Sequence, residues 1–213
     1  MGKIQKGILG GFSGIVGTVV GATWRGLEIM RSRPKKSSRI PTLRQADQRA
    51  RFLMAVRFLQ PVKPLLRRYF GQPAGTKSRS NLATSYHLTD AVIGTFPSLA
   101  IDYSKVILSR GELLGLQDAA ATPMSTAILK LTWTDNSGQG QALPTDLIFA
   151  AAYNETRKQW EYRMAAATRG TPAFNFQLPA AWVGETVHCW IAVASADDYL
   201  YGNSEYFGPL SLV

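Results

Sequence analysis

Few residues in this chain could carry acid–base chemistry, because its 213 residues include only two histidines and one cysteine. His87 lies in the stretch Ser-Tyr-His-Leu-Thr-Asp at 85–90, which has the residue types of a Ser–His–Asp triad. Triads, however, are assembled by the fold from separated positions, and the Gly-x-Ser-x-Gly elbow of many hydrolases is missing from the sequence. His188 faces away from the apolar row of its segment, which is typical of a surface or sheet histidine. We therefore expect no enzyme.

Metal and phosphate sites are also poorly supported. Cys189 has no second cysteine to pair with, and one thiol with two histidines does not suit a structural zinc site. The turn at Asp197 and Asp198 offers fewer oxygen ligands than calcium needs. The glycine-rich segments 10–14 and 71–77 lack the Gly-Lys-[Ser/Thr] ending of a phosphate-binding loop. We expect no cofactor and no metal.

The charge of the chain is strongly polarised. Residues 1–80 contain 17 Lys or Arg and two acids, a net charge of +15, whereas residues 81–213 contain 7 and 12, a net charge of −5. Such polarity indicates a polyanionic partner, an acidic surface on a neighbouring copy, or simply a solvated helix face. The basic contact face that we predict consists of Arg44, Arg49, Arg51, Arg57, Arg67 and Arg68.

The first 34 residues are apolar and rich in glycine, which recurs every three or four positions from Gly7 to Gly21. Each glycine inside a helix would cost about 1 kcal/mol relative to alanine, and the Val, Ile and Thr residues here favour strands. The stretch is too short and too interrupted for a transmembrane helix, and no clear cleavage site indicates a signal peptide. We expect an extended arm with turns at the glycines and a second hairpin strand from Thr23 to Arg31. Its predicted contact residues are Ile8, Leu9, Phe12, Ile15, Val16, Val19, Val20 and Trp24.

Helical spacing begins after a basic linker at 34–41. Thr42 and Gln45 form a capping-box pattern, and an apolar stripe with a helical period follows as far as Pro61. A short second helix is expected at 62–70, closed by Gly71. A third helical stretch is expected at 81–93.

From Leu99 onward the apolar period becomes two, which predicts strands. Seven short strands, separated by turn residues, are typical of an immunoglobulin-like or fibronectin-like sandwich. Their expected positions are 99–108 with a bulge near Ser104, 128–133, 147–153, 160–164, 174–178, 187–193 and 204–212. The predicted fold is α+β, with an arm at 1–34, a basic helical region at 35–95 and an antiparallel sandwich at 96–213.

Several phrases resemble one family: Gly11-Phe-Ser-Gly-Ile-Val-Gly-Thr-Val-Val-Gly21 with Trp24-Arg-Gly26, Arg31-Ser-Arg-Pro34, Thr42-Leu-Arg-Gln-Ala-Asp-Gln-Arg49 with Phe52, and Ile101-Asp-Tyr103 with Ser109-Arg-Gly111. They are similar, in the same order, to an uncharacterised family of unknown function that is common in Bacteroidota. The resemblance spans nearly the whole chain and is strongest from residue 7 to residue 71. It implies a bacterial source and the same layout, and it implies no activity.

These observations favour a structural subunit that assembles with copies of itself into a filament, an appendage or a virion-like particle. The apolar arm would add strands to a neighbour, and head-to-tail contacts would form rings or open filaments. The alternative is a nucleic-acid-binding protein that uses the basic helices. A third option is peptide or glycan binding near Trp182, Trp190, Tyr199 and Tyr201. We expect no membrane span, and either a cytoplasmic location or export as an assembly.

Overall fold

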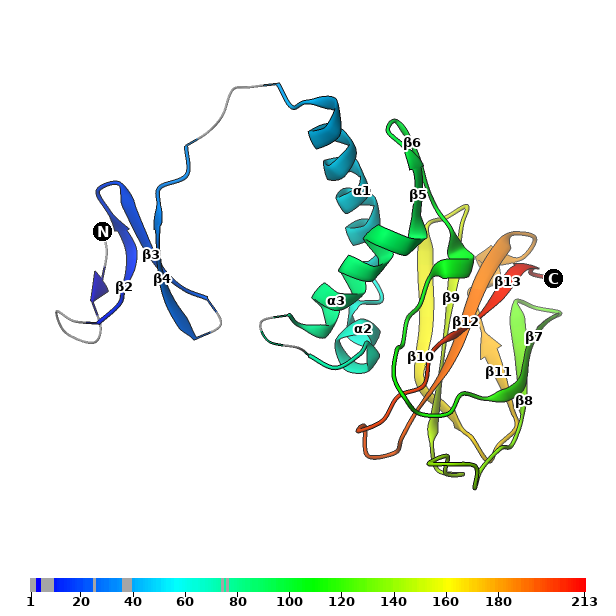
Figure 1. Ribbon diagram of the computed structural model, residues 1–213. Helices are drawn as coiled ribbons and strands as arrows, with labels where there is room; N and C mark the ends of the chain where they lie inside the picture. Colours follow the sequence, from blue (N-terminus) through cyan, green and yellow to red (C-terminus); the bar gives the residue numbers. More distant parts are fainter. Residues whose placement is uncertain (1–2, 5–9, 25, 36–39, 74, 76) are drawn as a thin grey trace. The chain divides into compact units, whose positions relative to one another are not determined.

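The glycine-rich N-terminal stretch forms a small antiparallel sheet, as Figure 1 shows. This structure is a computed structural model, which describes residues 3–4, 10–24, 26–35, 40–73, 75 and 77–213. The strands are β1 (Lys3–Ile4), β2 (Phe12–Val16), β3 (Val19–Trp24) and β4 (Leu27–Ser32), in that spatial order. Gly17 and Gly26 connect β2 to β3 and β3 to β4 with φ angles of 59° and 83°, which favour glycine. The expectation of extended segments with turns at glycines is confirmed. The predicted strand from Thr23 to Arg31 is wrong in its bounds, because the turn at Gly26 divides that range between β3 and β4.

The chain divides into two compact units, Met1–Thr42 and Leu43–Val213. The second unit begins with three helices, α1 (Leu43–Leu59), α2 (Lys63–Tyr69) and α3 (Arg79–Tyr86), and α3 continues as a π-helical segment, His87–Ala91. Pro64 lies in the first turn of α2, where its missing N–H is not needed. Ser78 caps α3, because its hydroxyl accepts a hydrogen bond from the backbone N–H of Asn81 (3.3 Å).

The segment between the helices and the sandwich differs from our prediction. It contains a two-stranded ribbon, β5 (Val92–Thr95) with β6 (Ser98–Ile101), and then a 3₁₀ turn, Tyr103–Lys105. Asp102 starts this turn by accepting hydrogen bonds from the backbone and the hydroxyl of Ser104. The predicted sandwich strand at 99–108 and its bulge near Ser104 are therefore wrong. The alternating apolar residues at 99–108 reflect burial and not a strand, because Val106 and Leu108 lie in the core beneath the helices.

Seven later strands form the sandwich, which confirms the predicted class of fold. They are β7 (Gln117–Met124), β8 (Ile128–Thr134), β9 (Leu147–Asn154), β10 (Gln159–Thr168), β11 (Ala173–Gln177), β12 (Thr186–Ala194) and β13 (Glu205–Ser211). One sheet has the order β10-β9-β12-β13 and the other the order β11-β8-β7, and all neighbouring strands are antiparallel.

The four-stranded sheet is covered on both faces. One face packs against the three-stranded sheet around Leu131, Ile148 and Val193. The other face packs against the helices, with Leu65 and Trp190 in a second core cluster. Two indole N–H groups attach neighbouring segments to this sheet. Trp160 donates to the carbonyl of Phe58 in α1, and Trp190 donates to that of Val106, which follows the 3₁₀ turn, both at 2.9 Å.

This arrangement explains why β9 and β12 are buried along nearly their whole length. A strand with both faces covered reads as a continuous apolar run. The expected boundary between residues 95 and 96 falls inside the unit Leu43–Val213, because the helices and the four-stranded sheet share the core cluster that contains Leu65 and Trp190.

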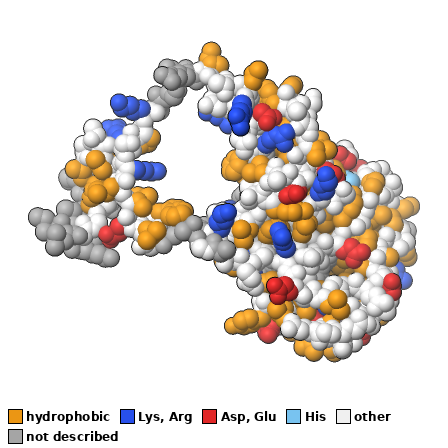
Figure 2. All heavy atoms as spheres, viewed as in Figure 1, with side chains coloured by type: hydrophobic (Ala, Val, Ile, Leu, Met, Phe, Trp, Pro, Cys, Tyr) orange, Lys and Arg blue, Asp and Glu red, His pale blue; other side chains and the backbone are white. Residues whose placement is uncertain are grey.

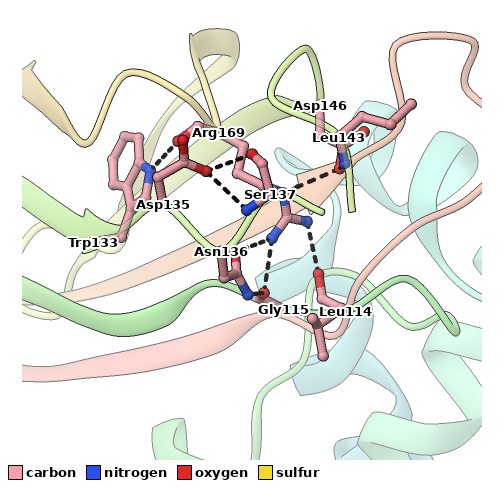
Figure 3. Close-up of polar contacts among 9 residues, drawn as sticks. All are labelled: Leu114, Gly115, Trp133, Asp135, Asn136, Ser137, Leu143, Asp146 and Arg169. Atoms are coloured by element: carbon pink, nitrogen blue, oxygen red, sulfur yellow. Dashed lines mark hydrogen bonds and ion pairs between the residues drawn. The ribbon is translucent and has the colours of Figure 1, made fainter. Parts of the chain in front are cut away.

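A buried arginine joins three loops at one end of the sandwich (Figure 3). The side chain of Arg169 is fully buried and forms an ion pair with Asp146, with Nε and Oδ2 3.1 Å apart. Its guanidinium also donates to the carbonyls of Leu114 and Gly115 and to the side chain of Asn136. A buried charge is tolerated only when it is paired and hydrogen-bonded. Arg169 therefore holds the segment before β7, the β8–β9 loop and the β10–β11 loop together.

Candidate functional site

The N-terminal sheet carries the predicted contact residues, and it has almost no core. Among the residues described between 10 and 35, only Gly21 is buried, and it has no side chain. Phe12 and Val20 are half-buried, whereas Ile15, Val16, Val19 and Trp24 are exposed. Ile8 and Leu9, the other two predicted contact residues, lie outside the described residues. In its described part, the sheet is thus a largely exposed apolar surface.

Alternation along the strands divides these side chains between two faces. The register pairs Gly14 with Gly21 and Ala22 with Ile29. One face, which we call the apolar face, therefore collects six hydrophobic side chains: Ile15, Val20, Ala22, Trp24, Leu27 and Ile29. The opposite face carries Phe12, Val16, Val19 and Met30 beside two glycines and Glu28.

A strand is predicted at Thr23–Arg31, but Trp24 alone of its side chains is among the predicted contact residues. Leu27, Ile29 and Met30 are exposed by 57%, 36% and 74% in β4. Two of them, Leu27 and Ile29, lie on the apolar face beside predicted contact residues such as Trp24. The alternation of Leu27, Glu28 and Ile29 was the signal that could have identified them.

Two close contacts explain why particular glycines occur in this sheet. The backbone N–H of Gly11 donates to the Glu28 carboxylate at 2.8 Å, and a Cβ at Gly11 would lie 2.2 Å from that same carboxylate. The Phe12 ring lies against Gly21, where a Cβ would come within 2.7 Å of the ring. These glycines permit close packing across the strands.

The predicted basic residues do not form one continuous face. Arg51 is half-buried, and its guanidinium pairs with Asp47 (3.0 Å) and donates to the backbone carbonyls of Val92 and Gly94. Arg68 forms an ion pair with Asp198, and this hydrogen-bonded pairing raises the pKa of the arginine. Both side chains therefore stabilise the fold of their own unit.

The other four arginines are exposed and have no ion pair within the part of the chain that the structure describes: Arg44, Arg49, Arg57 and Arg67. At about 100° per residue along a helix, Arg44 projects from α1 on a different side from Arg49 and Arg57. Hydrophobic side chains separate them, since Leu43, Phe52 and Leu53 are exposed by 82%, 52% and 49%. Figure 2 shows this mixture of apolar and basic side chains on one side of the molecule.

A groove runs beside α1. Its volume is ≈ 630 Å³, and we call it the α1 groove. One wall is the flank of α1 and the other includes Leu99, Ala100 and Ile101 of β6. Its floor is aromatic, because Phe58 contacts Tyr153 edge-on, with centroids 4.9 Å apart, and Trp160 at 5.0 Å. The remaining lining residues are Ala50, Leu53, Met54, Arg57, Tyr103, Glu155 and Lys158.

A buried histidine lies behind this groove. His188 is 5% exposed, stacks on Tyr103 with centroids 4.0 Å apart, and its Nδ1 is 2.7 Å from the Tyr206 hydroxyl. Its Nε2 lies 3.6 Å from the Glu155 carboxylate. Burial lowers the pKa of His188 despite that neighbour and raises the pKa of Tyr103. It is a sheet histidine, as expected, but it is buried beneath the helices rather than at the surface.

Both ring nitrogens of His87 are hydrogen-bonded to backbone groups. Its Nδ1 is 2.7 Å from the carbonyl of Ala83, and its Nε2 is 3.4 Å from the backbone nitrogen of Ile107, which donates to it. Nδ1 therefore carries the proton. Burial lowers the pKa of this histidine. His87 therefore connects α3 to the segment that follows the 3₁₀ turn. The structure does not place His87 and Asp90 as members of a Ser–His–Asp triad.

The remaining sequence candidates have structural partners. Asp197 accepts hydrogen bonds from the hydroxyl of Ser195 and the backbone of Tyr199, which closes a turn. Trp182, Trp190 and Tyr201 are buried, and only Tyr199 of that predicted recognition patch is exposed. The described residues contain no group of three or more potential metal ligands, and they form no helix that is long and apolar enough to cross a membrane.

Three comparisons with known proteins were made, and one of them identifies a family. A redesigned β-sandwich protein of known structure is similar over 48% of this chain and 95% of its own, with 15% identity and a TM-score of 0.31. No curated protein matches the chain. The model of a family of unknown function, DUF6266, matches residues 11–208, which include most of the N-terminal sheet and nearly all of the sandwich. The chain therefore belongs to this family of unknown function, DUF6266.

Proposed function

We propose that this protein is a structural subunit that assembles with copies of itself through its N-terminal sheet. The observation that carries the proposal is the missing core of that sheet, in which Gly21 is the only buried residue among those described from 10 to 35. A small sheet needs a covered hydrophobic face for stability. A neighbouring copy would supply that cover.

The energetic benefit of such a contact is considerable. Burying one leucine or isoleucine side chain contributes about 1.5–3 kcal/mol, and the apolar face holds three such residues together with Trp24. Contiguous exposed apolar surface of this kind is characteristic of interaction sites. A filament, a surface appendage and a virion-like particle all satisfy this requirement, and the family resemblance suggests a source in Bacteroidota.

The charge distribution supports contact between unlike parts of two copies. The basic first 80 residues would face the acidic remainder of a neighbour, which steers association and disfavours the contact of like surfaces. Because the two surfaces differ, the contact is heterologous and builds rings or open filaments.

Substitutions on the two faces of the sheet test the proposal with matched chemistry. Leu27→Thr with Ile29→Thr removes two hydrophobic side chains from the apolar face, whereas Val16→Thr with Met30→Thr removes two from the opposite face. Light scattering coupled to size-exclusion chromatography should show assembly lost in the first variant and retained in the second. A full-length wild-type chain that stays monomeric at every concentration would contradict the proposal.

Nucleic-acid binding is the second candidate, and the observation that favours it is the exposure of Arg44, Arg49, Arg57 and Arg67 without ion pairs in the described part of the chain. It ranks second because Arg51 and Arg68 are engaged within their own unit. It predicts retention on DNA or RNA that falls steeply with salt. Serine at positions 44, 49, 57 and 67 would abolish that retention, and no retention at low salt would contradict this candidate.

A further inference from the structure

Two hollows adjoin among the three helices of the unit Leu43–Val213, which Figure 1 shows packed together. The first, of ≈ 420 Å³, lies between α1 and α3, and we call it the helix trough. The second, of ≈ 270 Å³, lies at the start of α3, and we call it the basic hollow. Lys63, Ser80 and Asn81 line both of them. Together they have the size of a small-molecule site, and such sites often lie between packed helices.

The helix trough is apolar along α1. Phe52, Val56 and Leu59 are spaced by four and three residues, so they share one face of the helix, and Leu66 and Leu88 add apolar surface from α2 and the π-helical segment. Phe52 is 52% exposed and lies about 10 Å along α1 from Leu59. An apolar chain lying in the trough would take this surface out of water, which is favourable.

The basic hollow carries positive charge without an acid. Lys63 and Arg67 lie one turn apart on α2, and neither forms an ion pair with a described residue. Arg79 also lines the hollow, but its guanidinium donates to the carbonyl of Arg68 and lies over the Tyr201 ring. None of the described lining residues of either hollow is an aspartate or a glutamate. Two cations therefore await a counter-charge from outside the described chain.

Ser80 lies where the two hollows meet. Its Oγ atom is buried and has no hydrogen-bond partner in the part of the chain that the structure describes. A buried hydroxyl without a partner is costly, and an orphaned group of this kind calls for an explanation such as a bound water or ion. The hydroxyl can donate to an anion that Lys63 and Arg67 hold.

We propose that the two hollows together bind a single-chain amphiphile with a phosphate head group. The phosphate would lie in the basic hollow, where Arg67 can bind two of its oxygens and Lys63 adds a point charge. The apolar chain would lie in the helix trough against Phe52 and Val56. One chain fits a space between helices, which the surface of a bilayer could not enter. The site lies outside the N-terminal sheet, so this inference goes beyond the proposed function.

Isothermal titration calorimetry on the full-length chain tests this site. Three probes are titrated separately: n-octyl phosphate below its micelle concentration, octan-1-ol and inorganic phosphate. Octan-1-ol lacks the charge, and inorganic phosphate lacks the apolar chain. We expect n-octyl phosphate to bind more tightly than either of them by about ten-fold or more, because it alone makes both kinds of contact.

Three variants separate the two halves of the site, with circular dichroism as a check on folding. Lys63→Gln with Arg67→Gln removes two charge-assisted contacts and should weaken n-octyl phosphate by about 100-fold. Phe52→Ser should weaken n-octyl phosphate and leave the affinity for inorganic phosphate unchanged. The matched control is Arg44→Gln with Arg49→Gln, which removes two exposed arginines that line neither hollow and should bind as the wild type does.

Several results would overturn the proposal. One is equal affinity for n-octyl phosphate in the wild type and in Lys63→Gln with Arg67→Gln. Another is an affinity for octan-1-ol or for inorganic phosphate that equals the affinity for n-octyl phosphate. A third is binding to phosphatidylcholine vesicles that contain phosphatidate, without binding to dispersed n-octyl phosphate, which would assign the cations to a membrane surface. Absence of any binding would also refute the site, and it would leave the proposed self-assembly untouched.

Discussion

At the scale of single residues, Arg169 is the charged group on which three loops of the sandwich depend. It is fully buried, and Asp146 and three loop carbonyl or amide oxygens satisfy it. Removing one partner of a buried ion pair leaves the other charge uncompensated and costs about 3–5 kcal/mol. We predict a loss of stability of that size for Arg169→Met in urea unfolding followed by tryptophan fluorescence.

The double variant Arg169→Met with Asp146→Asn provides the control for this prediction. It removes both charges, so it should be less destabilised than Arg169→Met alone. Equal stability of the wild type and Arg169→Met would show that the buried ion pair is unimportant.

The two buried histidines predict a stability that depends on pH. Burial lowers the pKa of both His87 and His188 below the value of about 6.5 that each has in the unfolded chain. The unfolded state therefore binds more protons in mild acid. The stabilisation is complete above pH 6.5 and is lost as the pH falls toward the folded-state pKa, by up to about 1.4 kcal/mol per pH unit for each histidine.

Replacing His87 by glutamine tests the assignment of this effect. A glutamine side chain can donate to the carbonyl of Ala83 and accept from the backbone of Ile107, and it does not titrate. We expect His87→Gln to flatten the dependence of unfolding free energy on pH between 6.5 and 5. The carboxylates with lowered pKa, such as Asp102 and Glu185, lose their contribution only below about pH 4. An unchanged slope in His87→Gln would contradict the assignment.

At the scale of elements, α1 protects the ribbon through one side chain. Arg51 donates to two carbonyls on the outer edge of β5. Without those contacts the ribbon should open more often, so Arg51→Met is predicted to speed amide hydrogen exchange at Ile93 and Ala100, which face each other in the ribbon. Arg44→Met changes an exposed arginine of the same helix and should leave exchange there unchanged. Equal exchange in both variants would show that Arg51 does not hold the ribbon.

The helices and most sandwich strands were predictable because their apolar periods are strong. The first sandwich strand, β7, was not predictable from the sequence. It reads Gln-Asp-Ala-Ala-Ala-Thr-Pro-Met, and its alanines have little strand propensity. It is an edge strand, where Pro123 is tolerated. The segment at 99–108 has the apolar alternation of a strand, but its apolar residues are buried in the core beneath the helices and fix the connection to the sandwich. Local periodicity does not reveal which buried surface an apolar residue will meet.

The contact residues of the N-terminal sheet were only partly predictable. The residues from Phe12 to Trp24 stood out by composition, whereas Leu27 and Ile29 were recognised only from the register that places them on the apolar face. The internal partners of Arg51 and Arg68 could not be read from the sequence. Asp198 lies 130 residues from Arg68, and chain folding alone brings the two together.

At the scale of the whole molecule, the two units differ in what stabilises them. The unit Leu43–Val213 has two hydrophobic core clusters on either side of the four-stranded sheet. The N-terminal sheet has a large apolar surface and almost no buried side chain in its described part. The first unit is therefore expected to depend on a partner, whereas the second is expected to fold without it.

Removing residues 1–34 tests this account most directly. The mass of the full-length chain and of the truncated chain would be measured by light scattering over a range of concentrations, with circular dichroism as a check on folding. We predict a large species for the full-length chain and a folded monomer for the truncated one. A truncated chain that still assembles, or a full-length chain that remains monomeric, would contradict the central claim.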